Sequence, residues 1–141
     1  MEFLKLTFRE LPAGVVDERG EISATYQGIA QNDIGIRTDI IDNIPKAMGM
    51  KMLIRSMSPK VIAADEIGSK EDIEAIEYAV CSGVKGIFTA HGSNMADIEK
   101  NPILGQLLEK QLIEKILFIE ENRKISLGYD SKKQFCQKEA S

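Results

Sequence analysis

An acidic pair, Asp65 and Glu66, directly follows a short apolar run in the stretch KVIAADEIG. Hard cations such as magnesium prefer carboxylate and water oxygens, so Asp65 is suited to holding a hydrated magnesium ion. The neighbouring carboxylate of Glu66 is suited to orienting and polarising an attacking water molecule. Hydrolysis of ATP requires both roles. On its own, however, such a pair is more often a solvated turn that opens the next helix.

Further polar groups follow other apolar runs of the chain. Glu18 comes after GVVD, and both Thr89 and His91 come at or just after the end of VKGIFTA. Thr89 or His91 is a candidate for sensing the terminal phosphate of a nucleotide by hydrogen bonding. The competing interpretations are a structural histidine and, around Glu18, an ordinary polar loop in which Arg19 makes a local salt bridge.

Two arginines are candidates for contacting phosphate. Arg37 follows a long loop rich in glycine, asparagine and aspartate, and Arg55 lies in the predicted helix PKAMGMKMLIRSM. The planar guanidinium group suits phosphate oxygens, either within its own subunit or in a neighbouring one. The simplest interpretation of Arg55 is a surface cation on its helix.

These residues are carried by alternating predicted strands and helices. Strands are expected at 60–65, 84–90 and 116–121, with KISLGYD as an antiparallel partner of the third. Two short β-rich runs flank Gly20, and the stretch GIAQNDIGIRTDI is expected to be a loop. Helices are expected at 3–11, at 45–57 and after Ser69, which is a good N-cap.

Unbroken apolar strands that alternate with helices predict an α/β fold, with a mainly parallel sheet and helices on both faces. Ligands of such sheets bind at the carboxyl ends of the strands. The strands before Glu18, Asp65 and Thr89 should therefore deliver these polar groups to one edge of the sheet. Three strand ends that meet in this way predict a site, which none of them would predict alone.

Composition excludes several classes of protein. The chain has 141 residues and 43% hydrophobic residues, enough for a folded core. Its net charge of −4 gives no general electrostatic reason to bind nucleic acid, and its apolar runs are too short to span a membrane. The two cysteines, Cys81 and Cys136, fit a reduced cytoplasmic location.

The phosphate cradle of a nucleotide site is not found in the sequence. A P-loop reads G-x-x-x-x-G-K-[ST], so that backbone N–H groups and a lysine surround the phosphates. None of the eleven glycines is followed directly by lysine. The residues therefore predict half of an ATPase site.

The order of these segments resembles the stage III sporulation protein AA family, sporulation relatives of the type II and type IV secretion ATPases in the RecA-like P-loop group. The matching segments, spread over residues 14–120, are VVDERGEI, QNDIGIRTDI, PKAMGMKMLIRSMSPKVIAADEIG, EDIEAIEYAVCSGVKGIFTAHG and ILFIE. The resemblance implies the C-terminal part of a RecA-like ATPase domain at residues 13–130. A weakly matched segment, 1–12, precedes it, and a polar tail, 131–141, follows.

The resemblance also implies roles for individual residues. Asp65, as metal ligand, and Glu66, as catalytic residue, match the Walker B pair. The acidic box is matched by Asp17, Glu18 and Glu21, and the histidine box by Thr89, His91 and Gly92. By this match Glu18 and His91 are catalytic, and Thr89 and Gly92 bind the cofactor. Arg55 matches the catalytic arginine ahead of Walker B, and Arg37, in a segment typical of the sporulation branch, is a candidate for cofactor binding.

The chain departs from the family pattern at its beginning. Family members carry the P-loop strand, loop and helix before the segment that resembles GVVDERGEI, where this chain has only MEFLKLTFREL. The family's P-loop strand lies between the strands of GIFTA and ILFIE, so a gap or a rearranged pairing is expected in the sheet. The chain is accordingly expected to be N-terminally truncated, by a shortened reading frame, a split gene or the preparation of a fragment.

The implied function is ATP hydrolysis with magnesium, in a ring of copies of the same protein. The ring would energise a channel complex of sporulation membrane proteins at the membrane around the developing spore, and no nucleic acid is expected. Without a phosphate loop, this chain alone is expected to bind ATP–magnesium weakly and not to hydrolyse it. Two alternatives remain: a non-catalytic interaction module derived from the ATPase, and a remnant without a function of its own.

Overall fold

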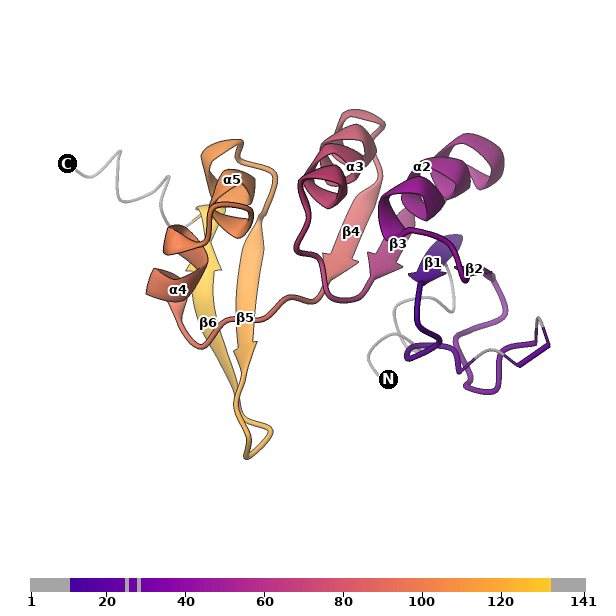
Figure 1. Cartoon of the computed structure of the whole chain (residues 1–141), viewed down its shortest axis with the longest axis horizontal. Coiled ribbons are helices and arrows are strands. Elements are labelled where there is room, and N and C mark those ends of the chain that lie inside the picture. Colours follow the sequence, from indigo (N-terminus) through magenta and orange to yellow (C-terminus); the bar gives the residue numbers. More distant parts are fainter. Residues whose placement is uncertain (1–10, 25, 28, 133–141) are drawn as a thin grey trace. The chain divides into compact units, whose positions relative to one another are not determined.

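The computed structural model describes residues 11–24, 26–27 and 29–132. The chain forms two compact units, Met1–Ala90 and His91–Ser141 (Figure 1). The predicted helix at residues 3–11 lies almost entirely outside the described residues, as does most of the predicted tail, residues 133–141.

The first unit is built on a four-stranded sheet in which all neighbouring strands are parallel. The strands β1 (Ala13–Asp17), β2 (Thr38–Asp42), β3 (Val61–Ala64) and β4 (Lys85–Phe88) follow the order β2-β1-β3-β4. Both central strands are buried along their whole length, as their apolar sequences predict. The predicted α/β fold with a mainly parallel sheet is confirmed.

Two local predictions around β1 were wrong. The last residues of the predicted loop GIAQNDIGIRTDI begin β2. Its apolar run is too short to predict a strand, and the strand conformation depends on pairing with β1. The β-rich run after Gly20 is not a strand, because the chain turns back at residues 21–23. There Tyr26 pairs only with Ile29, in an isolated bridge.

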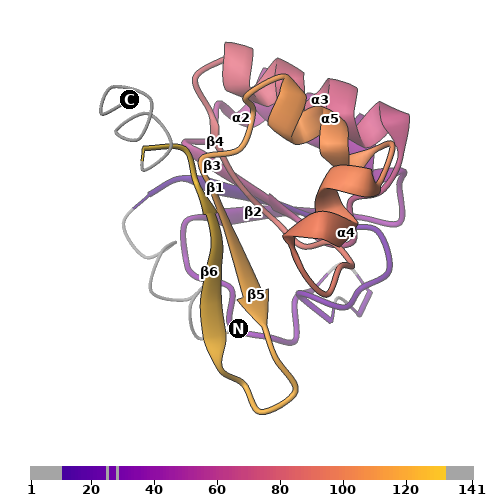
Figure 2. The same cartoon turned by 90° about the vertical axis from the view of Figure 1, so that its left-hand side faces the viewer.

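The helices α2 (Lys46–Met57) and α3 (Lys70–Cys81) lie side by side over one face of this sheet (Figure 1, Figure 2). Small residues allow the close approach of α2. A Cβ atom on Gly14 of β1 would lie 2.9 Å from Leu53, and one on Gly49 of α2 would lie 2.7 Å from Val16.

The opposite face of the sheet holds an apolar cluster. It consists of Ala13, Val15, Val61 and Ala63. Ile22, from the turn after β1, packs against this cluster. Among the described residues, both helices of this unit therefore cover one face, and a turn contacts the other.

The second unit contains two short helices and a hairpin. These are α4 (Met95–Lys100), α5 (Leu104–Glu109), β5 (Lys115–Ile119) and β6 (Ile125–Asp130). The predicted antiparallel pairing of the last two strands is confirmed. The ring of Phe118 packs against Gly128, and a Cβ atom at this position would clash with the ring.

Within the described part of the chain, β4 and β5 belong to different sheets. β4 pairs with β3, and β5 pairs with β6. The expected gap or rearranged pairing between the strands of GIFTA and ILFIE stays a prediction. Searching the same residues, we find no helix with the length and apolar character needed to cross a membrane.

Candidate functional site

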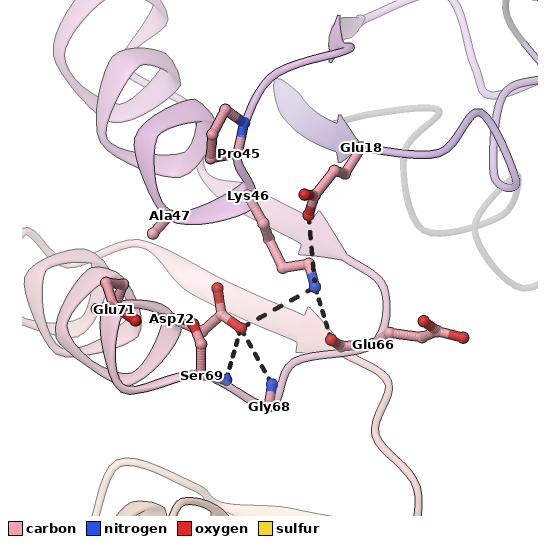
Figure 3. A pocket seen from close by; sticks show the side chains of 9 residues that line it. All are labelled: Glu18, Pro45, Lys46, Ala47, Glu66, Gly68, Ser69, Glu71 and Asp72. Atoms are coloured by element: carbon pink, nitrogen blue, oxygen red, sulfur yellow. Dashed lines mark hydrogen bonds and ion pairs between the residues drawn. The ribbon is translucent and has the colours of Figure 1, made fainter.

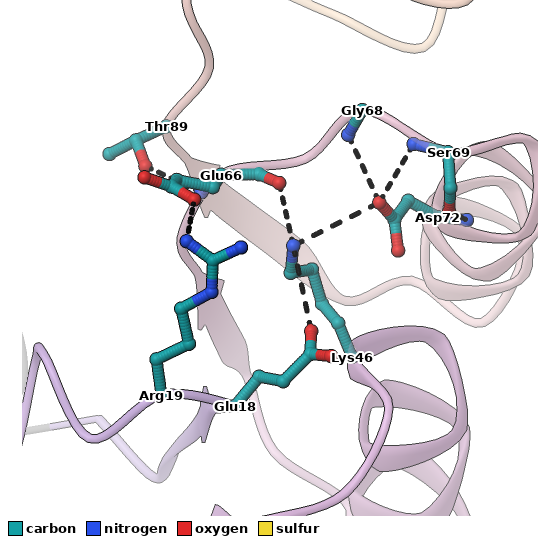
Figure 4. A network of polar contacts seen from close by, with 8 residues as sticks. All are labelled: Glu18, Arg19, Lys46, Glu66, Gly68, Ser69, Asp72 and Thr89. Atoms are coloured by element: carbon teal, nitrogen blue, oxygen red, sulfur yellow. Dashed lines mark hydrogen bonds and ion pairs between the residues drawn. The ribbon is translucent and has the colours of Figure 1, made fainter.

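Polar residues gather at the carboxyl edge of the four-stranded sheet. β1 ends at Asp17, β3 is followed by Asp65 and Glu66, and β4 is followed by Thr89. Because the strands are parallel, these ends share one edge, where ligands of open α/β sheets bind. Figure 4 shows Glu18, Glu66 and Thr89 at this edge.

Glu66 has an unusual backbone conformation. Its φ of 46° lies in the left-handed region, which residues other than glycine rarely adopt. Its N–H group donates a hydrogen bond to Oγ1 of Thr89, at 2.9 Å. Its carbonyl oxygen accepts a hydrogen bond from Nζ of Lys46, at 2.6 Å. Such strain costs about 1–3 kcal/mol and persists only where the surroundings hold it.

The side chain of Glu66 is partly exposed and is bound by an arginine. Nη1 of Arg19 donates a hydrogen bond to Oε2 of Glu66, at 2.8 Å. This ion pair of Arg19 is therefore not the local salt bridge of the competing interpretation, because its partner lies 47 positions away in sequence. The exposed fractions of the two side chains are 65% and 35%, so the pair contributes at most about 1 kcal/mol.

Lys46 is the central cation of this edge, and sequence reasoning missed it. Its side chain is only 10% exposed. Nζ lies 3.8 Å from Oε2 of Glu18 and 4.0 Å from Oδ2 of Asp72 (Figure 4). A cation in the first turn of a helix opposes the helix dipole. Nearby carboxylates offset this unfavourable term, so a lysine at the start of a predicted helix was the one local signal for such partners.

A pocket of about 450 Å³ opens around Lys46 (Figure 3). The N-terminal ends of α2 and α3 and the residues after β1 and β3 form its walls. The lining residues are Glu18, Pro45, Lys46, Ala47, Glu66, Gly68, Ser69, Glu71 and Asp72. Four carboxylates and one ammonium group make the pocket acidic overall.

The first turn of α3 is fixed by a capping box. Oγ of Ser69 accepts the N–H of Asp72 at 3.1 Å, and Oδ2 of Asp72 accepts the N–H groups of Ser69 and Gly68 at 3.0 Å each. The predicted N-cap is confirmed. Asp72 therefore faces Lys46 from a fixed position.

Asp17 has a structural part in the turn that follows β1. It is fully buried, and Oδ2 accepts hydrogen bonds from the backbone N–H of Ser23 at 2.8 Å and from its hydroxyl at 2.5 Å. Burial alone would raise the pKa of Asp17, but hydrogen bonds from Ser23, Ile22 and Glu21 lower the pKa below its ordinary value. Of the predicted acidic box, Glu18 is the member that lines the pocket.

The structure does not bring the two arginines to this edge. Arg55 lies in the last turn of α2, nine residues from Lys46, which is about 14 Å along the helix. Its guanidinium carbon lies 5.8 Å from the ring centroid of Tyr78. Arg37 directly precedes β2, at the amino end of that strand. Both arginines therefore lie toward the opposite edge of the sheet from Glu66.

The remaining predicted site residues are Asp65, His91 and Gly92. Asp65 follows β3 with a half-buried side chain. His91 and Gly92 begin the second unit, so their relation to Glu66 stays a prediction. In the described ranges of the chain, no three histidine, cysteine or acidic side chains form a metal-binding group.

Comparison with known proteins gives a family and a distant structural likeness. The family model described as "Sporulation stage III, protein AA" matches residues 7–133. Stage III sporulation protein AA of Bacillus subtilis (strain 168) is 45% identical over 104 residues, which are 74% of this chain and 34% of that protein. This chain thus spans about a third of the relative's length.

Among solved structures, the chain is similar to the Legionella pneumophila ATPase DotB. The TM-score is 0.48 and the sequence identity is 16%. The match covers 90% of this chain and 47% of that one.

Proposed function

The chain belongs to the stage III sporulation protein AA family, and from this premise we propose that it supplies the water-activating half of an ATPase site. The observation that supports the proposal most is the meeting of Glu18, Glu66 and Thr89 at one sheet edge, beside an acidic pocket. These groups come from three strand ends, and the parallel sheet fixes their order.

In this proposal Glu66 orients and polarises the attacking water. Its carboxylate is partly exposed, so water can reach it, and its main chain is held on both sides. A carboxylate placed in this way acts as a general base or as a hydrogen-bond acceptor for the nucleophile. Thr89 lies next to Glu66 and keeps its hydroxyl proton for a further acceptor.

Asp65 would hold magnesium, when nucleotide is bound. Magnesium is commonly held by one or two carboxylates together with phosphate oxygens and water, so one aspartate after a strand fits its donor preference. The ion neutralises charge on the phosphate oxygens during phosphoryl transfer. Glu18, which pairs with Lys46, adds negative charge on the other side of the pocket.

The phosphate-binding loop would come from the part of the whole protein that corresponds to the unmatched two thirds of the Bacillus relative. The chain spans about a third of its Bacillus relative, and no glycine of the chain is followed by lysine. We therefore expect the 141-residue chain by itself to bind ATP–magnesium weakly and not to hydrolyse it. The whole protein would form a ring of its own copies and energise a membrane channel complex during sporulation.

The place of Arg37 and Arg55 supports a role between subunits. Both lie toward the edge of the sheet that is remote from Glu66. In a ring, such residues can face the nucleotide of a neighbouring copy, where guanidinium groups would bind phosphate oxygens.

A chimera tests the proposed function. In the chimera, the 104 aligned residues of the Bacillus relative are replaced by the aligned residues of this chain. The remainder of the chimera, including its phosphate-binding loop, has the sequence of the relative. We expect magnesium-dependent ATP hydrolysis by the chimera and none by the isolated chain. A folded chimera that supports spore formation but hydrolyses no ATP would contradict the proposal.

The non-catalytic interaction module is the second candidate. It is favoured by the fact that Glu66 and Asp72 already have polar partners within the chain. Under this alternative, capture of partner proteins from a sporulating cell is unchanged by Asp65→Ala and Glu66→Ala. Loss of nucleotide-dependent capture in these variants would argue against it.

A further inference from the structure

We propose that Lys46 and Thr89 are positioning residues that together hold Glu66 in its left-handed conformation and so aim its carboxylate. This inference rests on the proposed role of Glu66 in activating water. Neither residue needs to touch the reacting atoms for this purpose. Lys46 is a residue to which the motifs of the sequence assign no role.

The two peptide groups that flank Glu66 are bound from different elements. Lys46, in the first turn of α2, donates to its carbonyl oxygen, and Thr89, after β4, accepts from its N–H group. The next residue is held as well, because the N–H of Ile67 donates to the carbonyl oxygen of Thr89 at 2.9 Å. Rotation about φ or ψ of Glu66 would break at least one of these bonds.

Thr89 also continues the pairing of β3 with β4. Its N–H donates to the carbonyl oxygen of Ala64 at 3.3 Å, and its own carbonyl accepts from Ile67. Between these two backbone bonds the chain of β3 leaves the ladder at Asp65 and Glu66. There the N–H of Glu66 donates to the hydroxyl oxygen of Thr89, which replaces the backbone carbonyl that would accept this bond in a regular ladder.

Contacts other than the bond to Glu66 also hold Lys46 in position. Its side chain is nine-tenths buried, and the carboxylates of Glu18 and Asp72 lie on two sides of its ammonium group. Asp72 is fixed in turn by the capping box of α3. The position of the lysine therefore depends on β1, α2 and α3, and the lysine in turn fixes the carbonyl oxygen of Glu66.

The backbone conformation of Glu66 is the direct test. NMR of the full 141-residue chain gives φ of Glu66 from its three-bond HN–Hα coupling and its intraresidue HN–Hα nuclear Overhauser effect. Lys46→Met keeps the length of the side chain but removes the donor, and Thr89→Val keeps the shape but removes the acceptor. We expect both variants to lose the positive-φ signature.

Matched variants separate positioning from a general loss of structure. Thr89→Ser keeps a hydroxyl and should keep the signature, as should Lys60→Met at an exposed lysine just before β3. Because Thr89 is exposed, Thr89→Val gives an answer even if Lys46→Met does not fold. Retention of the positive φ in either folded variant would overturn the proposal.

Kinetics of the chimera provide the second measurement. Lys46→Met should lower kcat for ATP hydrolysis about 100-fold, as expected for a misplaced reacting group. KM should change by no more than about twofold, because in this proposal the lysine acts through the backbone of Glu66 and not on the nucleotide. An unchanged kcat would overturn the proposal. If the unsubstituted chimera hydrolyses no ATP, the proposed function fails, and the NMR result still decides whether Lys46 and Thr89 position Glu66.

Discussion

The ammonium group of Lys46 lies 2.6 Å from the backbone carbonyl oxygen of Glu66, and this contact joins the start of α2 to the end of β3 (Figure 4). It connects residues that are 20 positions apart in sequence. The same lysine also contacts Glu18, directly after β1, and Asp72, in the first turn of α3. The candidate site is therefore held together by a cation among acidic groups.

Asp17 should make the stability of the chain depend on acidity. Its hydrogen bonds hold the folded-state pKa below the ordinary value of 3.8. The stabilisation is fully present above the unfolded-state pKa and is lost as pH falls through the lower, folded-state value. Asp17→Asn should lower the free energy of unfolding by about 2 kcal/mol at pH 7. Urea denaturation should show this difference shrinking at pH 3, and Asp39→Asn, at an exposed position of β2, is the control.

An equal difference between wild type and Asp17→Asn at both pH values would contradict this account. It would mean that the carboxylate charge of Asp17 does not contribute to the turn, and that shape alone explains the loss.

The capping box of α3 gives a second stability prediction. Ser69→Ala removes the acceptor for the N–H of Asp72, while the rest of the helix is unchanged. The free energy of unfolding should fall by about 1 kcal/mol, the usual cost of losing an N-cap. Urea titration should show a lower midpoint at constant m-value. Ser69→Asp should restore most of the loss, and a failure of this rescue would argue against capping as the cause.

Substitution of Gly49 should lower the stability of the chain, although glycine is itself unfavourable within a helix. Alanine at an exposed helical position usually stabilises by up to about 1 kcal/mol relative to glycine. Here the added Cβ would lie 2.7 Å from Val16, so Gly49→Ala should instead destabilise by about 1–3 kcal/mol. Gly68→Ala is the control, since apart from its chain neighbours no residue lies within 4 Å of its Cβ position. A higher midpoint of thermal unfolding for Gly49→Ala would show that α2 and β1 can move apart.

The central strands and the two long helices could be predicted because their signals are local. VIAA and its neighbours form a short apolar run, and the helix after Ser69 has a cap and a periodic apolar face. β2 was missed because its two isoleucines follow a loop-like stretch. Its strand conformation depends on pairing with β1, which no local pattern records.

The site was predictable only in outline. The carboxyl ends of parallel strands placed Glu18, Glu66 and Thr89 at one edge, and the structure shows this arrangement. The contacts of Lys46 and Arg19 reach 20 and 47 residues along the chain, so spacing could not reveal them. The left-handed φ of Glu66 could not be read from the sequence either, since glutamate has no preference for it. In our proposal it depends on Lys46 and Thr89, which bind its backbone from 20 and 23 positions away.

Replacement of the Glu66 carboxylate tests the central claim most directly. In single-turnover experiments on the chimera with ATP and magnesium, Glu66→Gln should slow hydrolysis by at least about 100-fold while the amount of bound nucleotide stays the same. Glu74→Gln, at an exposed position of α3, should hydrolyse ATP at the rate of the unsubstituted chimera. Hydrolysis by Glu66→Gln at that same rate would contradict the claim that this edge of the sheet activates the water.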